Sequence, residues 1–309
     1  MQKITYYLTV LILTILVLIY LKPSNDVNLN NVVAKTVSFS ENEEKVFFDS
    51  IPTVKGIKSS DEDLSKISWN RWTVDKFSIH SIDKDIGTYL YKNIKDIKKE
   101  VLVKWGLPNI EFNHEIRIFC CSSEENLQKL FNINKSSFEF KEDKKIIFVW
   151  LILNESNLNS FKSLMMSISL IELEFKYNYS FPLWIHRGMP SLCDVNKTKE
   201  HLEYMYNANK TGRIKNLIIL EQSEYDDLED NSKKLFDINS SILCLMIRKE
   251  FGQNNFQKCM LKNVKIYQQL GFKDLDSFSL KYRYYCHYLL DDYKKNILPE
   301  EYLNIKPKK

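Results

Sequence analysis

The order of the hydrophobic patterns along this chain of 309 residues is the feature that most constrains its fold. From residue 69 to Leu153, strand-like and helix-like segments alternate, and after Leu153 every sustained pattern repeats at the spacing of an α-helix. Strands mixed with helices and then helices alone are typical of an α+β domain. We therefore expect a small mixed sheet with helices, followed by an all-helical subdomain, without internal repeats.

The first half contains three predicted strands and two predicted helices. The strands are rich in β-branched and aromatic residues, and the longer helix carries an apolar stripe that ends before Gly106 and Pro108. Ser122 and Ser123, followed by two glutamates, are typical helix caps. The predicted strands are 77–81, 115–120 and 146–153, and the predicted helices are 86–104 and 124–131.

The second half is predicted to be helical throughout. Residues 159–175 place large apolar side chains on one face, and a further helix begins at Leu183 after Pro182. Gly252 and Gly271 follow two later apolar patterns, where glycine commonly ends a helix. The later predicted helices are 232–251, 255–268 and 278–291.

The N-terminus carries an uncharged apolar run, residues 4–21. At 1.5 Å per residue, a helix of this length can cross a thin bilayer core. No small-residue cleavage site follows the run. The sequence thus predicts an uncleaved membrane anchor with an extracytoplasmic body, and a buried N-terminal helix is the alternative.

The predicted organisation follows from these patterns. Residues after Pro23 are polar and lack a sustained period, as in a tether, and sustained patterns resume near Trp69. The predicted segments are an anchor at 1–22, a tether at 23–68, a folded domain at 69–291 with an α+β part (69–182) and a helical part (183–291), and a tail at 292–309.

Composition limits what charge can imply about partners. Lysine and asparagine are abundant while alanine occurs only twice, as expected from an AT-rich coding sequence, so lysine density is weak functional evidence. A net charge of +4 gives no basic footprint for nucleic acid. We therefore predict no nucleic-acid partner.

Several local patterns carry a resemblance to a known family. Residues 77–81, the turn Trp105-Gly-Leu-Pro108, strand 116–119 with the capped helix at 122–127, and Pro182-Leu-Trp-Ile-His-Arg-Gly188 occur in a recognisable order. They resemble the peptidase MA-like zinc metallopeptidases of the gluzincin group over roughly residues 69–290. The resemblance implies that 146–153 is the edge strand lining a substrate cleft.

The same resemblance implies that 159–175 is the zinc-binding helix and that the Pro-x-Trp-x-x-Glu-Gly motif of the family falls at 182–188. A catalytic zinc of this class needs His-Glu-x-x-His and a glutamate from the next helix. Here Ser167, Ile168 and Ile171 stand at the first motif, and Arg187 replaces the glutamate. We therefore predict no bound zinc, no catalytic residue and no other cofactor.

A catalytically inactive, metallopeptidase-like domain with a structural or peptide- or protein-binding role is the function that the sequence predicts. An extended peptide would add to the edge strand around Trp150. Glu172 is expected to form an ion pair with Arg187. The predicted remnant cleft consists of Trp150, Ser167, Ile168, Ile171, Glu172, Trp184, His186 and Arg187.

Two enzymatic alternatives stay open at this point. The first is an active metallopeptidase with a rearranged zinc site, whose ligands would come from Glu172, Glu174, His186 and His201. A membrane-bound glycosyltransferase would use Asp-x-Asp, and this triplet occurs at 61–63, 83–85 and 274–276. The six cysteines show no C-x-x-C spacing, and no local pattern supports a pair of Cys193 with a histidine.

Overall fold

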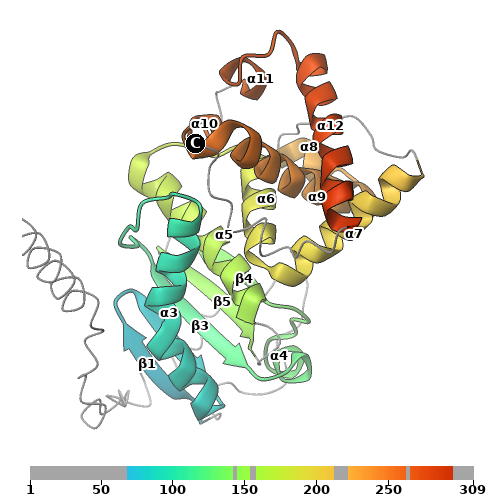
Figure 1. Ribbon diagram of the computed structural model, residues 1–309. Coiled ribbons are helices and arrows are strands. Elements are labelled where there is room, and N and C mark those ends of the chain that lie inside the picture. Colours follow the sequence, from blue (N-terminus) through green and yellow to red (C-terminus); the bar gives the residue numbers. More distant parts are fainter. Residues whose placement is uncertain (1–67, 142–144, 154–157, 212–221, 262–264, 295–309) are drawn as a thin grey trace, which may run out of the picture. The chain divides into compact units, whose positions relative to one another are not determined.

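The structure is a computed structural model that describes residues 68–141, 145–153, 158–211, 222–261 and 265–294 (Figure 1). All of these residues belong to one unit of the chain, 36–309. The fold is α+β. Every described strand precedes residue 153, and the described residues after it form helices and their connections. The predicted fold class is therefore confirmed at this level.

A five-stranded mixed sheet forms the first half. The strands lie in the order β1-β2-β3-β5-β4, with β2, β3 and β5 parallel and with β1 and β4 antiparallel at the two edges. Their bounds are β1 Asn70–Val74, β2 Phe77–Ser81, β3 Glu115–Cys121, β4 Ser137–Lys141 and β5 Ile146–Ile152.

Strand β5 is buried along its whole length because both faces of the sheet are covered. Its side chains alternate between the faces, as in any strand. Val149 and Leu151 join the main core, which includes helices α3 (Lys84–Lys104) and α5 (Leu158–Tyr177). Phe148 and Trp150 join a smaller core on the opposite face, with helix α4 (Glu124–Phe131).

Polar side chains cap the starts of α3 and α4, and the cap of α4 is the predicted Ser123. The Asp83 side chain accepts hydrogen bonds from the backbone N–H groups of Asp85 and Ile86 at the start of α3. Ser123 accepts one from the N–H of Asn126 at the start of α4. These caps fix where the two helices leave the sheet.

The second half consists of helices, which Figure 1 shows beside the sheet. Gly188 of α6 lies so close to α9 that an added Cβ would come within 2.5 Å of the Ser240 carbonyl oxygen. The two helices therefore pack backbone against backbone. The helices are α6 Leu183–Cys193, α7 Val195–Lys210, α8 Gln222–Asp226, α9 Asp230–Met246, the π-helix η3 Ile247–Phe251, α10 Gly252–Cys259, α11 Ile266–Gln269 and α12 Leu275–Lys294.

Three expectations about elements need correction. Residues 146–153 were expected to form the edge strand, but β5 pairs with β3 on one side and with β4 on the other. The edge position belongs to β4, which the sequence analysis did not predict. The helix expected at 255–268 is two helices, α10 and α11, and neither β1 nor α7 was predicted.

The prediction of a transmembrane helix also needs correction. Across the described ranges, no helix is both long enough and apolar enough to cross a membrane. The predicted anchor at 4–21 lies outside the described residues, as do nearly all of the predicted tether at 23–68 and of the tail at 292–309.

Candidate functional site

A cleft of about 580 Å³ opens beside the edge strand of the sheet. Ser137 and Phe138 of β4 line one side, and the last residue of β5, Ile152, contributes to the lining although it is largely buried. Helix α5 lines the other side, and α6 and α7 contribute Arg187 and Lys197. The cleft therefore joins the sheet to the helical half of the chain.

The α5 wall of this cleft is rich in hydroxyl groups. Ser160, Ser163 and Ser167 lie three and four residues apart, which places them on one face of the helix. Ser160 donates to the Asp194 carboxylate over 2.9 Å, and Ser167 donates to the backbone carbonyl of Ser163 over 3.3 Å. A serine wall can exchange hydrogen bonds with a polar ligand without introducing a charge.

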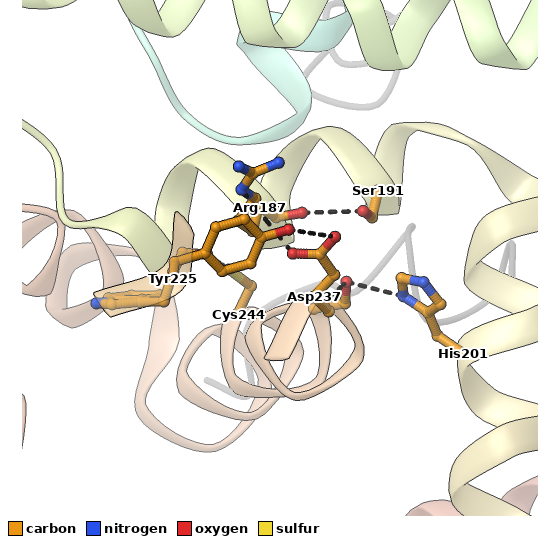
Figure 2. Close-up of polar contacts among 8 residues, drawn as sticks. Arg187, Ser191, His201, Tyr225, Asp237 and Cys244 are labelled. Carbon is orange, nitrogen blue, oxygen red and sulfur yellow. Dashed lines mark hydrogen bonds and ion pairs between the residues drawn. The ribbon is translucent and has the colours of Figure 1, made fainter. Parts of the chain in front are cut away.

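Arg187 is a charged residue of the cleft lining, and two side chains from outside the lining contact its guanidinium group (Figure 2). Its guanidinium carbon lies 4.1 Å from the centre of the Tyr225 ring. Its Nε lies 3.9 Å from Oδ1 of Asp237, an ion-pair distance that is too long for a hydrogen bond. The Tyr225 hydroxyl in turn donates to Oδ2 of Asp237 over 3.4 Å. One aromatic ring and one carboxylate thus position the guanidinium.

Burial changes the pKa values of the two residues that contact Arg187. It raises the pKa of Asp237, although the neighbouring Arg187 opposes that shift. Burial, followed by the Asp237 charge, raises the pKa of Tyr225 to about 12. Tyr225 therefore stays a neutral hydrogen-bond donor at physiological pH.

The structure brings two of the eight predicted cleft residues into the cleft, Ser167 and Arg187. Trp150 packs with Phe148 on the opposite face of the sheet. Ile168 and Trp184 are buried in the main core, and Ile171 is half-buried on α5 outside the cleft lining.

Glu172 is fully buried and does not pair with Arg187, so the expected ion pair is wrong. Its carboxylate accepts hydrogen bonds from the backbone N–H groups of Asn113 and His114, and it lies 2.7 Å from Nδ1 of His114. These contacts tie α5 to the loop that enters β3. The role of Glu172 in the described structure is to hold these two segments together.

The candidate ligands of a rearranged zinc site are separated. Nε2 of His186 lies 3.0 Å from the Glu174 carboxylate, but Glu172 faces His114. His201 lies against Ser241 on α9, with 3.0 Å between Nδ1 and Oγ. Among the described residues, no group of three or more His, Cys, Asp or Glu side chains could hold a metal ion.

The side chains at the gluzincin ligand positions do not suit zinc. Ser167 has its hydroxyl on a backbone carbonyl, Ile168 is buried, and Arg187 carries a permanent positive charge. Zinc prefers imidazole, thiolate and carboxylate ligands, so no step of a reaction is assigned to a metal here. That the protein binds no zinc stays a prediction, which metal analysis can test.

The Asp-x-Asp triplets within the described residues serve as helix caps. Asp83 caps α3, and Asp274 accepts a hydrogen bond of 2.8 Å from the Ser277 backbone N–H at the start of α12. The triplet at 61–63 lies outside the described residues. In each of the two described triplets, the first carboxylate already accepts a hydrogen bond from a backbone N–H group.

All six cysteines are buried and unpaired with one another. Burial raises the pKa of the Cys193 thiol to about 11. Cys193 is therefore a neutral thiol at physiological pH, which suits packing rather than nucleophilic attack.

Several residues of the cleft escaped the sequence analysis. Ser160 and Ser163 precede the predicted cleft residue Ser167 at helical spacing, which could have marked a polar face, and Phe138 and Phe140 alternate as in a strand. No local pattern could have paired Arg187 with Asp237, because 50 residues separate them. That contact exists only because α6 and α9 pack together.

Comparisons with family models, with curated proteins and with solved structures find no match to this chain. They support no peptidase activity. The candidate site therefore stands on its own geometry.

Proposed function

We propose that this chain binds an extended peptide or protein segment in the cleft between β4 and α5, and that it does so without zinc chemistry. One observation carries the proposal: β4 ends the strand order of the sheet, and its first residues line the same cleft as Arg187. In the described part of the chain, only β5 pairs with β4.

The chemistry of an edge strand supports peptide binding. Alternate backbone N–H and C=O groups of such a strand point away from the sheet, and an added strand can satisfy them. All five residues of β4 are half-buried, so the strand is accessible. The serine wall of α5 lies across the cleft and offers further hydrogen bonds to the bound segment.

We further propose that the scaffold is gluzincin-like. The order β2, α3, β3, α4, β5, α5 and α6 is the one that the resemblance implies, although β5 lies inside the sheet and the additional strand β4 forms the edge. The motif residue Gly188 packs against α9, and Arg187 enters the cleft beside it. The absence of zinc ligands makes this a binding cleft in the proposal rather than a catalytic one.

A peptide titration tests the binding function. A degenerate pool of fluorescein-labelled nonapeptides is titrated with the purified full chain, and anisotropy is recorded. We expect a saturable rise, and no rise for a matched pool with proline at every second position, because proline cannot donate to a strand ladder. Binding of no pool at any accessible concentration would overturn the proposal.

Metal analysis of the same preparation tests the second half of the proposal. We expect well under one zinc per chain after purification without chelator. Zinc at about one per chain, retained through dialysis, would contradict a cleft without zinc chemistry.

A further inference from the structure

We infer that the segment bound in the cleft presents a carboxylate to Arg187; this inference rests on the proposed function. The first observation is the direction of the guanidinium. In Figure 2, Nε faces Asp237 while the two terminal nitrogens point away from it. Among the described residues, no hydrogen bond occupies these nitrogens, and the Arg187 side chain is 35% exposed.

The second observation is that the guanidinium is held in place before any ligand arrives. The Tyr225 ring lies 4.1 Å from the guanidinium carbon, and Asp237 lies on the Nε side. Tyr225 and Asp237 are themselves joined by a hydrogen bond. Holding the side chain in this way lowers the conformational entropy lost on binding, because arginine otherwise samples many rotamers.

The third observation is the charge of the cleft. Its lining contains Arg187, Lys135 and Lys197 against one carboxylate, Glu124. Asp237 offsets part of the arginine charge, yet it does so from behind the guanidinium rather than from within the lining. An anionic group is therefore the complementary ligand for the cleft.

The shape of the donor suits a bidentate anion, which is a carboxylate or a phosphate, and an unmodified peptide supplies only the carboxylate. Two terminal nitrogens in one plane match the two oxygens of a carboxylate as a bidentate pair. Ser163, on the α5 wall of the same cleft, adds a hydroxyl that can donate to the same group. An acidic side chain or a free C-terminus of the bound segment supplies the same chemistry.

Four fluorescein-labelled nonapeptide pools test the inference with the purified full chain at about 150 mM salt. The first has central glutamine and an amidated C-terminus, the second has central glutamate and the amide, and the third has central glutamine and a free C-terminus. The fourth has central phosphoserine and the amide. We expect the second or the third pool to bind about tenfold more tightly than the first, and the tighter one identifies the source of the carboxylate.

Variants locate the effect. Arg187→Gln should remove the preference for carboxylate while binding of the first pool persists. Arg283→Gln, a matched change on the exposed face of α12 outside the cleft lining, should leave the preference intact. Because Arg187→Gln leaves Asp237 without its cation, the double variant Arg187→Gln/Asp237→Asn is measured too, with circular dichroism as the folding check.

The outcomes separate the two proposals. Equal binding of the first three pools, or a preference that survives in both Arg187 variants, overturns the carboxylate inference and leaves the peptide-binding function standing. Tighter binding of the phosphoserine pool than of both carboxylate pools overturns it in favour of phosphate. Failure of all four pools overturns the peptide-binding function and this inference with it.

Discussion

At the scale of single residues, burial decides the charge of two histidines. His80 packs against Phe119 between the sheet and α4, and burial lowers its pKa to about 3. His201 lies against Ser241, whose hydroxyl proton is donated to the Asp237 backbone carbonyl. Nδ1 of His201 therefore carries a proton and donates it to Oγ of Ser241. Burial lowers the pKa of His201 to about 4.

These lowered values predict a loss of stability in mild acid. Between about pH 4 and the usual histidine pKa of 6.5, the unfolded chain binds protons that the folded chain does not bind. The free energy of unfolding therefore decreases as the pH is lowered through this range. At pH 5 each histidine accounts for as much as about 2 kcal/mol. Urea unfolding at pH 7.5 and pH 5 measures this loss.

Glutamine variants assign the acid effect to residues. His201→Gln keeps a hydrogen-bond donor near Ser241 and cannot be protonated, so its loss between pH 7.5 and pH 5 should be smaller than that of the wild type. His80→Gln should behave likewise. His287→Gln, at an exposed position on α12, should match the wild type. A wild type with equal stability at both pH values would contradict the assignment.

Glu172 gives a second prediction at this scale. Glu172→Ala would strip the acceptor from the Asn113 and His114 backbone N–H groups and leave a cavity, so we expect a loss of roughly 3 kcal/mol in the free energy of unfolding. Glu203→Ala on the exposed face of α7 should change it by less than about 0.5 kcal/mol. Equal losses in the two variants would mean that the buried contacts do not stabilise the fold.

At the scale of elements, the contact of α6 with α9 positions the cleft. Gly188→Ala would bring a Cβ within 2.5 Å of the Ser240 carbonyl oxygen and 2.7 Å of the Cys244 sulfur. The two helices must separate, at a cost of about 1–3 kcal/mol. Thermal unfolding of the variant measures this cost.

A control for that prediction asks which of the two nearby atoms, the Ser240 carbonyl oxygen or the Cys244 sulfur, blocks the added Cβ. Adding Cys244→Ala removes the sulfur but leaves the backbone carbonyl of Ser240, so the double variant should not regain wild-type stability. Full recovery would show that the side chain, and not the backbone, sets the distance between α6 and α9.

Elements with strong periodicity were predictable from the sequence, and elements defined by pairing were not. The predicted positions of β2, β3 and β5 agree with the structure, as do those of α3, α4 and α5. Strand β4 is short and half-exposed and carries charged Glu139 and Lys141, so its pattern is weak. An apolar run like β5 gives no indication of whether it lies inside the sheet or at its edge, and here α4 covers its second face.

At the scale of the whole described unit, the cleft is built from segments that are distant in sequence. Ser137, Ser167 and Arg187 lie on a strand and two helices, and the support of Arg187 comes from Tyr225 and Asp237 further along the chain. The sequence resemblance identified Ser167 and Arg187. The cleft's serine wall and the Asp237 contact depend on packing, which local patterns do not encode.

Peptide-dependent hydrogen exchange of the full chain tests the central claim most directly. With the free-carboxyl nonapeptide pool bound, we predict slower exchange of the β4 amides, Ser137–Lys141, and unchanged exchange of β1, Asn70–Val74, which is the opposite edge of the same sheet. Protection of β1, or of a surface away from the cleft, with β4 unchanged would contradict peptide binding between β4 and α5.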